Sequence, residues 1–193
     1  VVLNAGDDVL LNVGTVQSIG TGDFRIDAGT STGTGVFTMA AGTLLDSNGG
    51  SLIIDADGDV TLAEIDHQSV GATDDVTIIS TGGSITLLAG EGGLVATAGA
   101  SVNLNADSDV TLNEATTVDT AGTVTVDADV DNDGTGTLAT SAAGTIAAGT
   151  GDIQIIAADA VLAGAITSSG ALTFLPSTTG STIGVGGGAG SFN

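Results

Sequence analysis

The sequence predicts an all-β protein, a parallel β-solenoid in which short strands stack coil upon coil. Three observations predict this fold. A short alternating unit recurs eight times, the mean interval between copies is about 24 residues, and helical periodicity is nowhere sustained. Similar strands in the same order favour stacking over a β-sandwich, whose hairpins would alternate in mirror image around a larger aromatic core. We expect a right-handed β-helix of about eight three-stranded coils.

The first strand of each coil is marked by the unit apolar-x-apolar-x-small. Its copies lie at residues 1–5, 24–28, 52–56, 76–80, 102–106, 124–128, 153–157 and 172–176. A period of two puts Val, Ile and Leu on one face of the strand and Thr, Asn, Asp or Gln on the other. Like side chains should therefore stack into aliphatic columns inside a narrow core, as for Leu3, Ile26, Ile54 and Leu104.

A turn rich in Gly and Asp follows most copies, and a second short strand follows the turn. The clearest second strands are at residues 9–11, 60–62, 85–87, 110–112 and 160–162. A third, weaker apolar patch closes several repeats, as at residues 16–19 and 94–95. Longer intervals are explained by outward loops at 29–35 and 131–137, which a stack tolerates. The solenoid is expected over residues 1–183, with a Gly-rich tail or linker over 184–193.

The composition excludes several functional classes. Of the 193 residues, 23 are acidic and the only basic ones are Arg25 and the neutral His67, so the net charge is -22. Such a chain repels nucleic acid and anionic membrane surfaces. No apolar run approaches the ~18 residues of a membrane-spanning helix, so no membrane insertion is expected. The hydrophobic share of 41% opposes disorder. The chain begins at Val1 without a leader, which predicts a piece of a longer protein.

Three aspartates form the best candidate metal site. Asp129, Asp131 and Asp133, followed by Gly134, resemble the opening of a calcium loop, with oxygen ligands at alternate positions and a glycine for the sharp turn. A full EF-hand loop would need a glutamate where Thr140 stands. The pattern allows two interpretations, a solvated polar turn without a cofactor or a turn that binds Ca²⁺ with backbone carbonyls and water completing the shell.

A second set of aspartates repeats the theme at the same corner of the coil. Asp55, Asp57 and Asp59 are the second candidate calcium ligands, and Asp107 and Asp109 recur in the same pattern. Stacked carboxylates repel one another, which cations would relieve. The alternative is that acidic turns keep the rod soluble and discourage aggregation through its sides.

Catalytic residues are scarce, and we expect the protein not to be an enzyme. His67 lies between Asp66 and Gln68, where we expect an exposed loop residue without a positioned partner. Lys, Tyr and Cys are absent. A threonine face that orders water, as on ice-binding solenoids, is an alternative interpretation of the threonines at residues 61, 77, 86, 111, 123 and 125. Because the Thr-x-Thr unit does not recur at the same place in successive coils, exposed strand positions are the preferred interpretation.

Two stretches carry a family resemblance. Residues 50–62 and 100–112 share the pattern Gly/Ala-Ser-Leu/Val-x-Leu/Ile-x-Ala followed by Asp-x-Asp-Val-Thr-Leu. This pattern resembles the repeats of filamentous-haemagglutinin-like giant surface adhesins. The resemblance implies a right-handed parallel β-helix, export to the cell surface, and a role as stalk or adhesive fibre. The family's Asn-Pro secretion signature is absent, because the only proline, Pro176, follows Leu175. The resemblance then implies the repetitive shaft.

We therefore expect a structural, non-catalytic segment of an extracellular adhesin, surface fibre or matrix filament. Its open ends predict that it continues in a longer chain or stacks end to end with copies of itself. A host or neighbouring-cell surface is the further expected partner. Two alternatives remain. One is a calcium-stabilised surface-layer or matrix module, and the other is a β-helix polysaccharide-active enzyme with paired carboxylates beside an aromatic rim.

Overall fold

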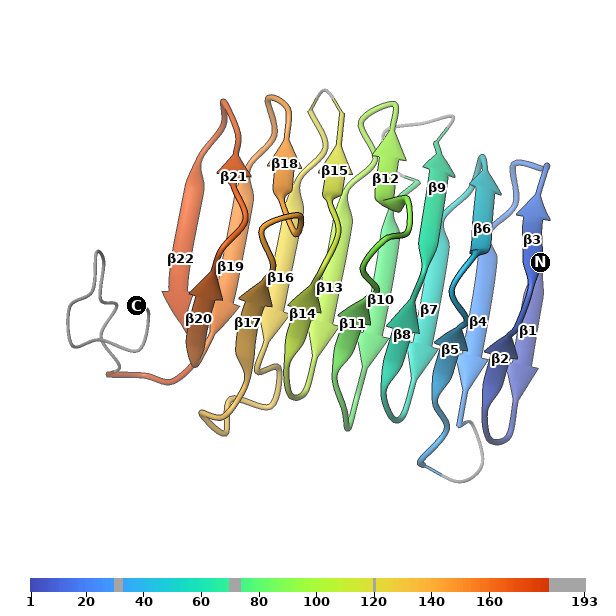
Figure 1. The fold of residues 1–193 in the computed structure, drawn as a ribbon, viewed down its shortest axis with the longest axis horizontal. Coiled ribbons are helices and arrows are strands. Elements are labelled where there is room, and N and C mark those ends of the chain that lie inside the picture. The colour runs from blue at the N-terminus through green and yellow to red at the C-terminus, as the bar shows by residue number, and fades with distance from the viewer. Residues whose placement is uncertain (30–32, 70–73, 120, 181–193) are drawn as a thin grey trace.

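The computed structural model describes residues 1–29, 33–69, 74–119 and 121–180. In these residues the chain forms 22 β-strands and no helix, wound into three parallel sheets (Figure 1). No helix within these ranges is long and apolar enough to cross a membrane. The predicted parallel β-solenoid is confirmed. Residues 184–193, predicted as a tail or linker, lie outside the described residues.

Each coil contributes one strand to each sheet. Sheet A contains β1 (Val2–Ala5), β4 (Phe24–Ala28), β7 (Leu52–Ala56), β10 (Val76–Ser80), β13 (Val102–Ala106), β16 (Val124–Ala128), β19 (Ile153–Ala157) and β22 (Leu172–Pro176). Sheet B contains β2 (Val9–Leu11), β5 (Phe37–Met39), β8 (Val60–Leu62), β11 (Ile85–Leu87), β14 (Val110–Leu112), β17 (Thr137–Thr140) and β20 (Asp159–Leu162). Sheet C contains β3 (Gly14–Ser18), β6 (Thr43–Asn48), β9 (Glu64–Gln68), β12 (Gly93–Thr97), β15 (Thr116–Val118), β18 (Ile146–Ala148) and β21 (Ile166–Thr167).

The coil count is lower than predicted. The described residues form seven complete three-stranded coils and β22, the first strand of an eighth. The eight alternating units are all present, but the last of them supplies a sheet A strand alone. In Figure 1 the chain descends along sheet A at the back and rises along sheets B and C in front while it advances from right to left, which makes the coil right-handed. At about 4.8 Å per coil, seven coils span roughly 35 Å.

Like residues stack on like in the core. Leu3 pairs in register with Ile26, Ile26 with Ile54, and the column continues through Ile78 to Leu104. The predicted aliphatic column is therefore confirmed. Sheet A strands from β4 to β19 alternate buried and half-buried residues, because successive side chains of a strand point to opposite faces.

The corner between sheets C and A is too tight for side chains in the later coils. A Cβ on Gly122 would lie 2.0 Å from the carbonyl oxygen of Ala100, and one on Gly151 would lie 1.9 Å from that of Gly122. Such distances are far inside van der Waals contact, so the backbones of successive coils approach closely only because these residues are glycine. The abundance of glycine in the sequence thus has a packing cause at this corner.

The outward face of sheet B carries a single file of threonines. Thr38, Thr61, Thr86 and Thr111 occupy the central position of four successive strands and pair in register. Each of these four strands points only that one threonine outward, while Thr77 and Thr125 lie on sheet A. The hydroxyls therefore form one file rather than a two-dimensional array.

Candidate functional site

The predicted calcium loop forms the corner of the sixth coil. It joins β16 in sheet A to β17 in sheet B, and it is an outward insertion as expected for residues 131–137. Asn132 has φ 59° and Gly134 has φ 88°, so two residues of the left-handed region turn the chain back on itself. The ligand oxygens of Asp129, Asp131 and Asp133 all lie within 4.8 Å of one another. The structure thus brings together the three aspartates that the sequence singled out.

Asp129 is fully buried at the base of this loop. Its Oδ1 accepts the Asp133 N–H at 3.0 Å, and its Oδ2 accepts the Gly134 N–H at 3.0 Å and the hydroxyl of Ser177. Both oxygens of the carboxylate are therefore engaged by the protein. These bonds compensate the burial of a charge. They also connect the sixth coil to the segment that follows β22.

Asp131 and Asp133 are exposed at the tip of the loop. Asp133 Oδ1 accepts the N–H and the hydroxyl of Thr135, at 2.9 and 2.6 Å. A hydrogen bond from the Asp133 N–H lowers the pKa of Asp131, but desolvation and the charges of Asp107 and Asp133 outweigh it, so this pKa is raised. Asp107 belongs to the corner of the preceding coil. The predicted repulsion between stacked acidic corners therefore acts on this loop.

Asp127, on β16, lies beside the loop. Partial burial raises the pKa of its carboxyl group, a hydrogen bond from the Asp129 N–H opposes this, and the neighbouring charge of Asp129 adds to it. A hard cation such as Ca²⁺ takes six to eight oxygen ligands in proteins. The free oxygens of Asp131 and Asp133 and backbone carbonyls are the donors available here.

The other predicted metal ligands do not converge. Asp55 points outward from β7 and pairs with Arg25, whereas Asp57 and Asp59 lie in the turn after β7. Asp57 Oδ1 accepts the Thr81 hydroxyl at 3.4 Å, and Asp59 Oδ1 accepts the Ser84 N–H at 2.8 Å. Among the described residues, Asp129, Asp131 and Asp133 are the only three carboxylates close enough to share an ion. The alternation of Asp55, Asp57 and Asp59 fails as a ligand set because a strand and a turn aim their side chains in different directions.

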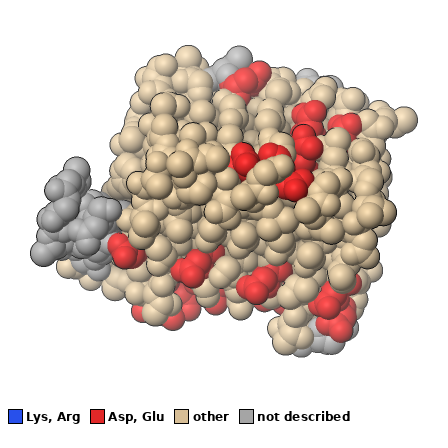
Figure 2. Space-filling model, viewed as in Figure 1, with Lys and Arg blue, Asp and Glu red and all other residues tan. Residues whose placement is uncertain are grey.

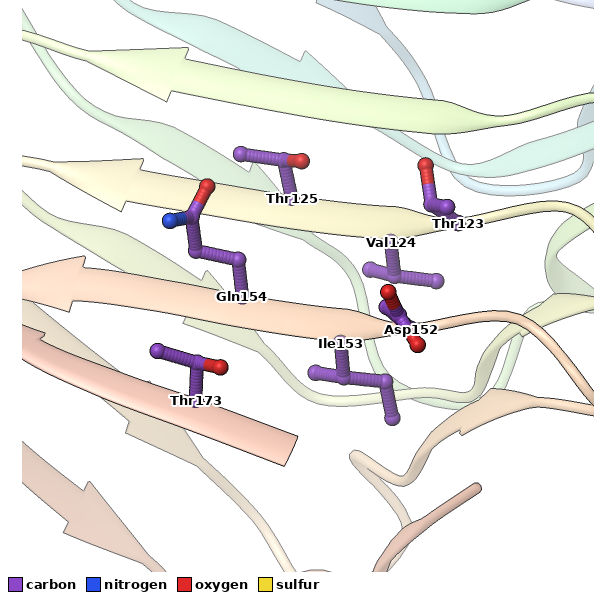
Figure 3. Close-up of a pocket in the computed structure, with 7 residues that line it drawn as sticks. All are labelled: Thr123, Val124, Thr125, Asp152, Ile153, Gln154 and Thr173. Atoms are coloured by element: carbon purple, nitrogen blue, oxygen red, sulfur yellow. The ribbon is translucent and has the colours of Figure 1, made fainter. Parts of the chain in front are cut away.

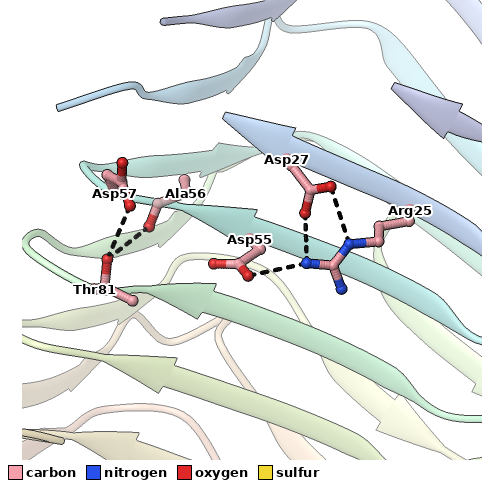
Figure 4. A network of polar contacts seen from close by, with 6 residues as sticks. All are labelled: Arg25, Asp27, Asp55, Ala56, Asp57 and Thr81. Atoms are coloured by element: carbon pink, nitrogen blue, oxygen red, sulfur yellow. Dashed lines mark hydrogen bonds and ion pairs between the residues drawn. The ribbon is translucent and has the colours of Figure 1, made fainter. Parts of the chain in front are cut away.

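Arg25 forms an ion-pair network on the outward face of sheet A (Figure 4). Its Nη2 lies 2.6 Å from Asp27 Oδ1 and 3.2 Å from Asp55 Oδ2, and its Nε donates to Asp27 Oδ2 at 3.0 Å. Asp27 and Asp55 pair in register on neighbouring strands. The side-chain hydrogen bond to Asp27 is the main cause that raises the pKa of Arg25. The only arginine thus neutralises two stacked carboxylates, which a ligand would have to displace.

Several corner aspartates accept a hydrogen bond from a backbone N–H of the next coil. Where sheet A turns into sheet B, Asp8 Oδ1 accepts the Val36 N–H at 3.0 Å and Asp109 Oδ1 accepts the Thr137 N–H at 2.9 Å. Where sheet C turns into sheet A, Asp75 Oδ1 accepts the Ser101 N–H at 2.8 Å. Similar bonds join Asp23 to Ser51, Ser101 to Thr123 and Asp152 to Ala171. We call these cross-coil caps, and they extend the backbone ladders through the corners.

The sequence interpretation missed the cross-coil caps. Metal binding and solubility were the two interpretations of the acidic turns, and Figure 2 shows carboxylates gathered along the lower edge, over the turns from sheet A to sheet B. The signal for caps was nevertheless present. Asp, Ser or Thr directly precedes the first apolar residue of successive sheet A strands, at positions 23, 51, 75, 101, 123 and 152.

His67 is not the exposed loop residue that was expected. It is fully buried within β9, stacked between Ser47 of β6 and Ala96 of β12. Its Nε2 lies 2.8 Å from the carbonyl oxygen of Asp74, so Nε2 carries the proton and donates. The neighbours Asp66 and Gln68 suggested a polar loop, but they are the outward positions of a strand whose alternation places residue 67 inside.

The described aromatic side chains belong to the core. Phe24 and Phe37 are fully buried, and Phe174 packs against the core from the last strand. Within the described ranges, no aromatic rim lies beside paired carboxylates.

No protein-family model, no curated protein and no solved structure matches the chain.

Proposed function

We propose that the chain is a structural, non-catalytic shaft segment of an extracellular adhesin, surface fibre or matrix filament. The observation that carries this proposal is the coil-to-coil register. Each strand pairs in parallel with the equivalent strand of the next coil, so three ladders run unbroken along the rod. The caps carry hydrogen bonding across the corners. Such a stack transmits load between its ends. The resemblance to haemagglutinin-like adhesin repeats supports the same role.

The ends of the rod support continuation of the ladders. Of the ten exposed large hydrophobic side chains among the described residues, nine lie on or beside the first coil or on the last two. They are Val1, Val2, Leu10, Val13, Ile19, Val161, Leu162, Leu172 and Leu175. The strands β1, β2 and β3 each pair on one side only. A further coil, from a longer chain or from a second copy, would pair with the unpaired backbone and pack beside these apolar groups.

Labelling of intact source cells tests the location of the shaft. Antibody against this chain, followed by electron microscopy, should decorate structures outside unpermeabilised cells. Permeabilised cells serve as the control for epitope access. Label that appears only after permeabilisation would contradict the extracellular shaft. Separate micrographs of the purified chain test stacking. If copies stack end to end, the rods should lengthen with protein concentration, and if they do not, single short rods should appear at every concentration.

A calcium-stabilised surface-layer or matrix module is the second candidate, and the convergence of Asp129, Asp131 and Asp133 favours it. Ca²⁺ that binds the folded chain alone would raise its melting temperature by mass action. Thermal unfolding in Ca²⁺ and in chelator therefore tests it. A rise of many degrees that disappears in Asp131→Asn supports the module, with Asp7→Asn as the matched control. Equal melting temperatures in both buffers would rule it out.

A further inference from the structure

A shallow depression lies on the outward face of sheet A, across β16, β19 and β22 (Figure 3). Its volume is about 280 Å³, and it is lined by Thr123, Val124, Thr125, Asp152, Ile153, Gln154 and Thr173. Pockets that enclose a whole small molecule are usually about 300–1,000 Å³. The depression is therefore suited to contact part of a longer ligand lying on the sheet.

Three polar side chains line up across the depression. Thr125, Gln154 and Thr173 occupy equivalent positions of neighbouring strands, so they follow one another at about 4.8 Å. Figure 3 shows them in a row on the same side of the sheet. All three are half-buried, and within the described part of the chain their side chains have no hydrogen-bond partner. They present donors and acceptors that no described residue uses.

Two other polar side chains that line the depression already have hydrogen-bond partners. Thr123 Oγ1 donates to Ser101 Oγ at 3.1 Å, and Asp152 Oδ1 accepts the Ala171 N–H at 2.7 Å. These two residues belong to the cross-coil caps, which fix the rim of the depression. The row of three is thus set apart from the corner residues, whose hydrogen bonds the fold already uses.

The charge around the depression selects the ligand. Asp152 is the only charged residue that lines it. The sequence contains no lysine, and its only arginine is paired with Asp27 and Asp55 on β4 and β7. An anionic ligand would find no counter-charge here and would be repelled by the acidic rod. Beside the row, Ile156 and Leu175 pair in register and provide an aliphatic strip.

We propose that this face binds a hydroxyl-rich, non-anionic saccharide chain that lies across β16, β19 and β22. Thr125, Gln154 and Thr173 exchange hydrogen bonds with its hydroxyls, and Asp152 accepts from a hydroxyl or an amino group. Ile156 and Leu175 contact its C–H faces. Because no aromatic ring stacks on the sugar, affinity comes from several weak contacts along the chain. This binding function goes beyond the shaft role and does not rest on it.

Calorimetric titration of the purified chain with three matched probes tests the proposal: hexamers of glucose, glucosamine and galacturonate. The glucosamine hexamer should bind at least as tightly as the glucose hexamer, and the galacturonate hexamer should not bind. Gln154→Leu and Thr125→Val should each weaken binding about fivefold, the value of one lost neutral hydrogen bond. Thr86→Val, on the threonine file of sheet B, is the matched control and should leave affinity unchanged.

Several outcomes would overturn the saccharide site. They are no saturable binding of the glucose and glucosamine hexamers, equal binding by the galacturonate hexamer, or unchanged affinity in Gln154→Leu and Thr125→Val. Circular dichroism and melting curves of each variant confirm that it is folded before titration. The cell-labelling experiment is read separately, so loss of the saccharide site leaves the shaft proposal standing, and the reverse also holds.

Discussion

At the scale of single residues, the acidic side chains are part of the fold as well as of its charge. A carboxylate that accepts a backbone N–H from the next coil satisfies a donor that the strand ladder cannot reach at a corner. This explains how a chain with a net charge of -22 folds with one arginine. Repulsion between corners remains, but many of the carboxylates are held by hydrogen bonds.

Asp75 tests the cross-coil caps. Asp75→Ala removes the acceptor of the Ser101 N–H, and we expect it to lower the free energy of unfolding by about 1–2 kcal/mol. Asp75→Asn keeps a carbonyl oxygen at the same place and should lose less than half as much. Urea unfolding of the two variants and the parent measures the difference. Equal losses for alanine and asparagine would show that charge, and not hydrogen bonding, is what Asp75 contributes.

Asp127 gives the fold a defined pH response. Its pKa is raised in the folded state, mainly by burial, so the folded chain binds this proton more tightly than the unfolded chain does. The stabilisation from protonation is complete below the unfolded pKa of about 3.9. This stabilisation is lost as the pH rises through the folded pKa. At neutral pH the partly buried carboxylate therefore lowers the free energy of unfolding.

We therefore expect Asp127→Asn to stabilise the protein at pH 7 by less than about 1 kcal/mol. The gain should shrink as the pH falls through the folded pKa, because the parent carboxyl group then becomes protonated. Urea unfolding across this pH range measures it, with Asp7→Asn as the control for loss of one charge. A gain that is the same at every pH, or a loss at pH 7, would contradict the assignment.

At the scale of elements, corners decide how closely the coils approach. The strands need only alternating apolar residues, whereas the corner between sheets C and A requires glycine in the later coils, where one backbone passes directly over another. Ala100, Gly122 and Gly151 follow one another at this place in three successive coils. Strand and corner therefore impose different rules on neighbouring residues.

Gly122→Ala should destabilise the solenoid strongly. The new methyl group would lie 2.0 Å from the Ala100 carbonyl oxygen, so two coils must separate locally, at a cost of about 3 kcal/mol or more. Gly20→Ala is the matched control. A Cβ there has no atom within 4 Å, so we expect no loss, or a gain of up to about 1 kcal/mol. Thermal melting of both variants checks the contrast, and similar melting temperatures would contradict the close approach.

The sequence predicts a strand correctly where alternation of apolar and polar residues runs through the whole strand. All eight sheet A strands and the column through Ile54 follow from alternation alone. Sheet C strands such as β15 and β21 carry too few large apolar residues to be recognised singly, and pairing with neighbouring coils defines them. His67 was misplaced because its polar neighbours concealed the alternation. The Asp129 loop was found because its spacing is local, whereas its contact with Ser177 joins residues far apart in the sequence.

At the scale of the whole molecule, the structure is a one-dimensional stack. Each coil contacts the coils before and after it, so stability is a sum of coil terms and neighbour terms. The same regularity produces the three ladders, the file of threonines on sheet B and the row of free polar groups on sheet A. The proposed shaft and the proposed saccharide face both depend on this one repeated register.

Engineered disulfides test this register most directly, because the chain contains no cysteine. Thr86 and Thr111 pair in register on adjacent coils, at about 4.8 Å, within the range that a disulfide spans. Thr61 and Thr111 lie two coils apart, at roughly 10 Å, beyond that range. On oxidation, the double variant Thr86→Cys with Thr111→Cys should form an intramolecular disulfide at native stability, and Thr61→Cys with Thr111→Cys should not. Efficient closure of the second pair, or failure of the first, would contradict the parallel in-register stack.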